Sequence, residues 1–319
     1  MKNQSYSVCL DDKYYHEFIS LYNSWKYYEH TTPIKIYIVG EIDDSRLNNL
    51  KDKFEVIDLR SFFTKNPRKL KKYLYKWVSM LEYSNDYEIL LDADTIFLSN
   101  TEHMFSYLKE GKLVLCNEHF DIEHKFYQYK EKWKYEHNRI QNELRKYLGN
   151  YANRFTSELK TPNYNAGFFG INKKKHSYLL EKCIEILISD FDTSPNPMTQ
   201  TEQYMMNVLI QLYNEDKMVL PQIEWMNTWE YHKNPKKMIK IEDGKFKVID
   251  EKGNHIKFYH FTGDIGVLHL NSKMLKPCRM YNLVEPKFFS PKEVEKLWYN
   301  RHQSPVILLW EYFYNKGLS

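Results

Sequence analysis

The chain has 319 residues, 42% of them hydrophobic and 28% charged, and its formal net charge is +4 at pH 7. This length allows one large or two small domains with a sizeable buried core. The small positive excess is interspersed with acidic residues, which argues against a dedicated nucleic-acid-binding protein with a strongly basic surface.

The first part of the chain alternates short apolar runs with segments of helical periodicity. In order, we expect a strand at 6–10, a helix at 14–28, strands at 33–40 and 54–59, a helix at 70–83, and strands at 88–94 and 112–116. Strands that alternate with helices predict an α/β fold with a mixed, mainly parallel sheet flanked by helices. In such sheets, ligands bind at the carboxyl ends of the strands.

The second part of the chain begins with a long, polar and mostly helical region at 118–160, which we interpret as an insertion. After it we expect a strand at 163–172, helices at 174–191 and 201–214, an extended segment at 218–227, and a hairpin at 238–264 with turns at Asp243-Gly244 and Gly253-Asn254. We predict that residues 1–270 form one domain. We predict that residues 271–319 form a C-terminal helical extension packed on that domain.

The sequence also lacks the signatures of several classes of protein. The four cysteines form no C-x-x-C pair, which argues against a zinc site. The first residues contain no apolar stretch of signal-peptide length, and no apolar run is long enough to span a membrane. We therefore expect a soluble, cytoplasmic protein.

Two Asp-x-Asp pairs occur in the chain, and their surroundings differ. Asp92 and Asp94 end the apolar run "EILL", which is typical of a buried strand, whereas Asp190 and Asp192 follow a helix and open a proline-rich loop. Neighbouring carboxylates near a buried strand are costly unless a cation neutralises them. Oxygen ligands favour Mg²⁺ or Mn²⁺. We therefore predict a metal site at Asp92 and Asp94 and a surface turn at the second pair, with a turn-capping role as the alternative for the first.

The segment "LLDADTIF" resembles the Asp-x-Asp segment of nucleotide-sugar glycosyltransferases of the GT-A fold, which is Rossmann-like. The resemblance is greatest to glycosyltransferase family 8, the glycogenin and bacterial galactosyltransferase group. Further segments resemble that family in the same order along the chain: "CLDDKYY", "YLYKW", "YNAGFFGIN", "TEQYMMN" and "YHFTGD". The resemblance covers roughly residues 6–265.

The resemblance implies a role for one or two residues in each segment. It assigns Asp11 and Tyr14 to the nucleobase end of the donor, and Lys76 and Gly263 to the diphosphate. It assigns His260 to the metal as a third ligand beside Asp92 and Asp94. It assigns Asn165, Glu202 and Gln203 to the donor sugar and the anomeric centre. The implied activity is transfer of a hexose from a UDP-sugar to an acceptor hydroxyl, with retention, using Mn²⁺ or Mg²⁺. The acceptor class (glycan, lipid-linked or protein) stays open, and the insertion at 118–160 could cover the acceptor side.

The sequence departs from the family pattern at three places. Lys13 stands where the family usually has asparagine, and Glu202 stands where it has aspartate. The segment "GDIGVLH" lacks the Lys-Pro-Trp that follows the glycine, so Lys273 or Lys276 could supply the missing charge. An inverting enzyme would instead need a carboxylate base, for which Glu202 or Asp264 is available.

Two other functions fit parts of the same pattern. A haloacid-dehalogenase-like phosphatase would use Asp92 as nucleophile and Asp94 as acid. However, the glycine that this class has before the threonine is missing before Thr95. The class also has a second carboxylate shortly after a Gly-Asp pair, but residues 267–269, which follow Gly263-Asp264, are Val-Leu-His. A non-catalytic nucleotide-sugar-binding protein that keeps the GT-A fold is the third possibility.

Overall fold

The computed structural model describes residues 3–65, 74–117, 138, 141–142, 144–155, 163–188, 201–220, 225–227, 238–249, 253–260, 312–314 and 316. The chain divides into two compact units. The first unit comprises residues 1–9, 33–91 and 104–220, and the second comprises residues 10–32, 92–103 and 221–319. The predicted domain end at residue 270 lies outside the described residues and stays a prediction.

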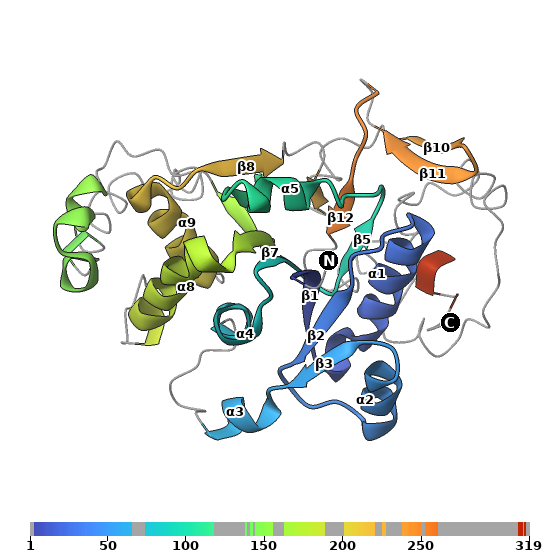
Figure 1. Ribbon diagram of the computed structural model, residues 1–319, viewed down its shortest axis with the longest axis horizontal. Coiled ribbons are helices and arrows are strands. Elements are labelled where there is room, and N and C mark those ends of the chain that lie inside the picture. Colours follow the sequence, from blue (N-terminus) through green and yellow to red (C-terminus); the bar gives the residue numbers. More distant parts are fainter. Residues whose placement is uncertain are drawn as a thin grey trace, which may run out of the picture. The chain divides into compact units, whose positions relative to one another are not determined.

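The first unit is built on a seven-stranded sheet in the order β3-β2-β1-β4-β7-β6-β8 (Figure 1). Its strands are β1 (Gln4–Leu10), β2 (Ile34–Ile38), β3 (Glu55–Asp58), β4 (Tyr87–Leu91), β6 (Leu113–Asn117), β7 (Tyr164–Asn172) and β8 (Lys217–Leu220). The pairs β1–β4, β2–β3 and β6–β8 are parallel, whereas β7 is antiparallel to both β4 and β6. The prediction of a mixed, mainly parallel sheet is confirmed, and β4 is its middle strand.

The predicted strand at 88–94 is corrected at its carboxyl end. The strand β4 stops at Leu91, and the residues Asp92 to Asp94 form a turn in which the N–H of Thr95 donates to the carbonyl oxygen of Asp92 (3.1 Å). The chain then enters a short strand, β5 (Thr95–Phe97), which we did not predict. The apolar run ends at Leu91, and a tight turn closed by a backbone hydrogen bond brings both aspartates out of the strand.

The middle of the sheet requires a glycine where two strands approach closely. The strand β7 is buried along all but its last residue, as a near-continuous apolar run predicts for a strand covered on both faces. At Gly170, a Cβ atom would lie 2.9 Å from the Cβ of Val114 and 3.3 Å from Cγ1 of Ile89. The neighbouring strands β6 and β4 therefore leave no room for a side chain at this position.

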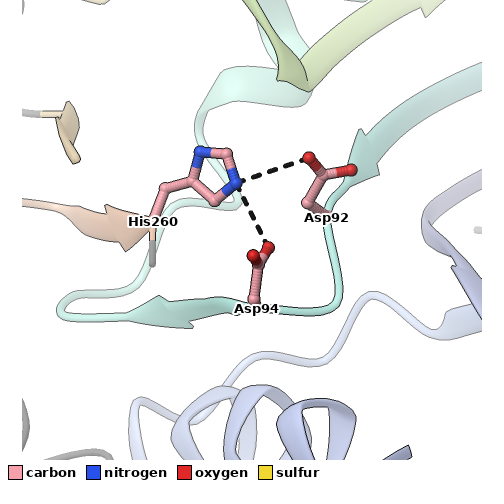
Figure 2. A group of neighbouring side chains, drawn as sticks. All are labelled: Asp92, Asp94 and His260. Carbon is pink, nitrogen blue, oxygen red and sulfur yellow. Dashed lines mark ion pairs between the residues drawn. The ribbon is translucent and has the colours of Figure 1, made fainter. Parts of the chain in front are cut away.

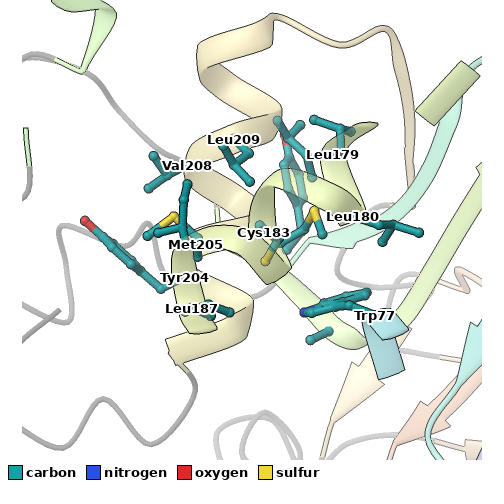
Figure 3. Packing of buried hydrophobic residues seen from close by; sticks show 14 of the residues in the cluster. Trp77, Leu179, Leu180, Cys183, Leu187, Tyr204, Met205, Val208 and Leu209 are labelled. Atoms are coloured by element: carbon teal, nitrogen blue, oxygen red, sulfur yellow. The ribbon is translucent and has the colours of Figure 1, made fainter. Parts of the chain in front are cut away.

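Helices of the first unit pack on this sheet and on one another. They include α2 (Asp44–Lys51), α3 (Arg60–Lys65), α4 (Tyr75–Tyr83), α5 (Met104–Lys109), the 3₁₀ helix η4 (Gly149–Arg154), α8 (Lys173–Ile188) and α9 (Thr201–Tyr213). A large apolar cluster joins α4, α8 and α9, and Figure 3 shows Trp77, Cys183 and Met205 within it. These side chains are fully buried. The helical periodicity of the three segments therefore matches the faces that form the core.

Among its described residues, the second unit contains one long helix and two small sheets. Its elements are the 3₁₀ helix η1 (Asp12–Tyr14), α1 (Tyr15–Tyr27), β5, β9 (Trp225–Asn227), β10 (Met238–Glu242), β11 (Lys245–Ile249) and β12 (Phe258–His260). The three-stranded sheet has the order β5-β12-β9, and β10 and β11 form the predicted hairpin. The hairpin turn at Asp243 (φ 51°) and Gly244 (φ 74°) has two positive φ angles, which is why Asp-Gly occurs there.

The C-terminal residues that the structure describes pack on α1. Phe313 is fully buried, and the side-chain amide of Asn23 donates to its carbonyl oxygen (2.7 Å). Other predicted features lie outside the described residues: the pair Asp190 and Asp192, most of the insertion at 118–160, Gly263, Asp264, Lys273, Lys276, and the C-terminal extension apart from 312–314 and 316. In the described part of the chain, no helix combines the length and the apolar character needed to cross a lipid bilayer.

Candidate metal centre and donor site

The structure brings Asp92, Asp94 and His260 together in the second unit. Figure 2 shows the two carboxylates of the turn after β4 facing the imidazole of His260, the last residue of β12. The Nε2 atom of His260 lies 3.4 Å from Oδ2 of Asp92 and 3.1 Å from Oδ1 of Asp94. One ligand atom from each residue lies within 4.8 Å of the other two. These are the three residues that the resemblance to family 8 assigns to the metal.

Strand pairing places the histidine beside the turn. The strand β12 is antiparallel to β5 with His260 opposite Thr95, the residue that follows Asp94. The strand β5 is held in turn by α1, because the backbone N–H of Phe97 donates to the hydroxyl of Ser24 (3.0 Å). The geometry of the cluster therefore depends on three segments that are far apart in the sequence.

Electrostatics in the cluster favour a positive charge among the three side chains. Burial by itself would lower the pKa of His260, but the charges of Asp94 and Asp92 and their hydrogen bonds to the imidazole raise that pKa to about 9. A divalent cation would meet the same need. Two carboxylate oxygens and one imidazole nitrogen are a donor set that suits Mn²⁺ and is compatible with Mg²⁺. The residues present therefore fit the metal that the sequence led us to expect.

The last residue of the helix η1, Tyr14, is affected by the charges of Asp92 and Asp94. Asp11 caps η1, since its Oδ1 accepts a hydrogen bond from the backbone N–H of Tyr14 (3.3 Å). Burial raises the pKa of the Tyr14 phenol, Lys13 opposes this, and the charges of Asp94 and Asp92 raise the pKa further. Asp11 and Tyr14 therefore belong to the same unit as the candidate metal ligands, and Tyr14 interacts with that pair electrostatically.

The predicted sugar-binding residues Asn165 and Gln203 lie in the first unit, where both are buried. The Oδ1 atom of Asn165 accepts a hydrogen bond from the N–H of Gly167 (2.6 Å). The Oε1 atom of Gln203 accepts one from the N–H of Ala166 (3.0 Å), and its Nε2 atom donates to Oδ1 of Asn163 (2.9 Å). Both amides thus shape the start of β7.

Asn163 and Asn207, which we did not predict from the sequence, complete this network. Asn207 donates from Nδ2 to the carbonyl oxygen of Tyr164 (3.1 Å) and to Oδ1 of Asn163 (3.3 Å). Its own Oδ1 accepts from the N–H of Tyr164 (3.2 Å). The signal was present in the sequence, because Gln203 and Asn207 are four residues apart and share one face of α9.

Two further predicted residues of the first unit lie on helices. Lys76 is in the first turn of α4 and half-buried, and Glu202 is the second residue of α9. Their assignments to the diphosphate and to the anomeric centre stay predictions.

The chain has the GT-A fold and resembles glycosyltransferases of family 8 in structure. The chain is similar to the crystal structure of an active-site mutant of LgtC, with a TM-score of 0.52 and 14% identity over 88% of this chain and 94% of that chain. It is also similar to the galactosyltransferase LgtC in complex with donor and acceptor sugar analogs, with a TM-score of 0.51 and 14% identity over the same shares of the two chains.

Sequence comparison identifies the family. Residues 7–193 match the family described as "Mannosyltransferase putative", and because this match spans more than half of the chain, the protein belongs to that family. A search of curated protein sequences finds no significant match.

Proposed function

We propose that this glycosyltransferase transfers a hexose from a nucleoside-diphosphate sugar to an acceptor hydroxyl, with a divalent metal held by Asp92, Asp94 and His260. The observation that carries the proposal is the convergence of these three side chains within 4.8 Å of one another. In the proposed reaction the metal, when bound, supplies positive charge to the diphosphate as it leaves.

The other residues have proposed roles that follow from the resemblance to glycosyltransferase family 8. Asp11 and Tyr14 bind the nucleobase end of the donor, while Lys76 and Gly263 bind the diphosphate. Asn165, Glu202 and Gln203 orient the donor sugar, and the two buried amides offer dipoles whose directions are set by their hydrogen bonds to the backbone and to Asn163. Preorganised dipoles of this kind stabilise the charge that develops at the anomeric carbon.

We propose a retaining reaction. The acceptor hydroxyl attacks the anomeric carbon on the face from which the diphosphate departs. As the new C–O bond forms, the bond to the leaving phosphate oxygen breaks, and that phosphate takes the proton of the hydroxyl. The complex of LgtC with donor and acceptor sugar analogs supports a sugar hydroxyl as acceptor. The family description supports mannose as the sugar, whereas the resemblance to family 8 supports UDP as the nucleotide.

A donor screen tests the proposal directly. We would incubate the protein with UDP-glucose, UDP-galactose and GDP-mannose, with Mn²⁺, with Mg²⁺ and with EDTA, and measure release of the nucleoside diphosphate. We expect release from one of these donors only with a metal. Equal release in EDTA would contradict the metal centre, and no release from any donor would favour a non-catalytic nucleotide-sugar-binding protein.

Substitutions assign the metal site. Asp92→Asn and Asp94→Asn keep the size of the side chain but remove its charge, so we expect each to reduce turnover by about 100-fold or more. Asp190→Asn changes the second Asp-x-Asp pair in the same way and should leave turnover within about twofold. Near-normal turnover in both members of the first pair would refute the assignment.

A further inference from the structure

The lysine at position 13 lies where two charged segments meet. The parallel strands β1 and β4 pair with Val8 opposite Leu91, so they end at the same edge of the sheet. Beyond these ends, the chain continues into residues 11–14 after β1 and into residues 92–94 after β4. Because both segments begin where paired strands end, they lie near one another, and the charges of Asp94 and Asp92 raise the pKa of Tyr14.

The charge balance of these two segments is strongly negative. They contain four carboxylates, those of Asp11, Asp12, Asp92 and Asp94, and one cationic side chain, that of Lys13. A nucleoside diphosphate is itself a multiply charged anion. A divalent cation neutralises only part of the carboxylate charge, so binding a diphosphate here calls for a further positive group.

The side chain of Lys13 is placed to supply that charge. Its Nζ atom lies 3.2 Å from the hydroxyl oxygen of Tyr14 and 4.8 Å from the centroid of the Tyr14 ring. These two contacts hold the ammonium group of Lys13 against Tyr14, on which the charges of Asp92 and Asp94 act. Lys13 is exposed, so a ligand can reach it. An ammonium group has three N–H donors, which makes the contact with Tyr14 compatible with a simultaneous contact to phosphate.

We propose that Lys13 is a specificity-determining residue that binds phosphate oxygens of the donor's nucleoside diphosphate. This inference rests on the proposed function. It gives a role to the lysine at this position, where glycosyltransferase family 8 usually has a neutral asparagine. It also supplies a cation in a chain whose segment after Gly263 lacks the lysine of Lys-Pro-Trp.

The chain offers a matched control for this lysine. Lys26, in the last turn of α1, is also exposed and lies over a tyrosine ring, with its Nζ atom 5.6 Å from the centroid of Tyr22. Lys26→Asn therefore removes one charge and one cation–π contact from the same unit, as Lys13→Asn does. Lys13→Arg keeps the charge and tests whether charge is what matters.

The experiment is isothermal titration of the full chain with UDP and with GDP in the presence of Mn²⁺, at several NaCl concentrations. We expect Lys13→Asn to weaken binding of the preferred diphosphate by about 10- to 100-fold, because a charge-assisted contact to phosphate is lost. Lys13→Arg should stay within about fivefold of the wild type, and Lys26→Asn should not differ from it. The affinity of Lys13→Asn should also depend less steeply on NaCl, which a merely structural change would not produce.

The outcomes separate this inference from the proposed function. If the wild type binds UDP or GDP and Lys13→Asn binds it equally well, the role of Lys13 is refuted while the proposed function stands. If Lys13→Arg loses as much affinity as Lys13→Asn, or if the salt dependence is unchanged, the phosphate contact is refuted. If the wild type binds neither diphosphate in Mn²⁺, the proposed function fails, and this inference fails with it.

Discussion

Acidification should destabilise the second unit through His30, a buried histidine that holds the end of α1 near β5. The backbone N–H of Thr101 donates to Nε2 of His30 (3.1 Å), so Nε2 must carry a lone pair. The other ring nitrogen, Nδ1, then carries the proton and donates to the carbonyl oxygen of Trp25 (3.0 Å). A second proton on the ring would place the N–H of Nε2 against the backbone N–H of Thr101 and break the hydrogen bond between them.

The pKa gives the size and the direction of the effect. Burial lowers the pKa of His30 from 6.5 to about 4, against the opposing effects of the Trp25 carbonyl and Glu102. Because the pKa is lower in the folded state, the unfolded chain binds the proton more readily. The neutral ring therefore stabilises the fold fully above pH 6.5, and this contribution is lost as the pH falls toward 4. At about 1.4 kcal/mol for each unit of pKa, the loss is about 3 kcal/mol.

The assay is urea unfolding of the wild type and of His30→Gln, followed by circular dichroism at several values between pH 7.5 and pH 4. Glutamine is neutral throughout this range, so the difference between the two proteins isolates the titration of His30. Buried His176, whose pKa is also about 4, contributes equally to both. We expect the stability advantage of the wild type to shrink by about 3 kcal/mol on acidification. A difference that does not change with pH would refute the argument about His30.

Three further predictions concern packing and buried hydrogen bonds. Gly170→Ala should lower the free energy of unfolding by about 1–3 kcal/mol, because its Cβ would lie 2.9 Å from that of Val114; an unchanged melting temperature would mean that β6 and β7 separate easily. Phe313→Ala should lower the free energy of unfolding by about 3–5 kcal/mol, because the ring is fully buried. Phe62→Ala, at an exposed ring, should lower it by less than about 0.5 kcal/mol. Similar losses for the two variants in thermal melts would contradict the packing of the C-terminal residues. Asn207→Ala should lower the free energy of unfolding by about 1–3 kcal/mol and lower kcat, because the buried N–H and C=O of Tyr164 lose their partner. A normal kcat would show that the start of β7 does not need this amide.

Much of the fold follows from local patterns in the sequence. Apolar runs predicted the strands of the main sheet, and their alternation with helical segments predicted that the sheet is mainly parallel. The hairpin was also predictable, because Asp243 and Gly244 both tolerate the positive φ angles of its turn. The position of Asp92 and Asp94 after a buried strand led us to predict the metal site at this pair, whereas the pair at 190 and 192 lies outside the described residues. All of these signals are local, since periodicity and turn chemistry act over a few residues.

Tertiary structure decided which distant side chains meet. The register of β12 against β5 places His260 beside the turn that holds the carboxylates, and no local pattern encodes that register. Gln203 could have been a surface amide on α9, but packing against β7 buries it, and its Oε1 atom accepts a hydrogen bond from the N–H of Ala166. Glu88 lies within the apolar strand β4, and it is tolerated because the hydroxyl of Tyr37, on β2, donates to its carboxylate (2.9 Å). A buried polar group needs partners from other elements, so its role becomes visible only when those elements pack together.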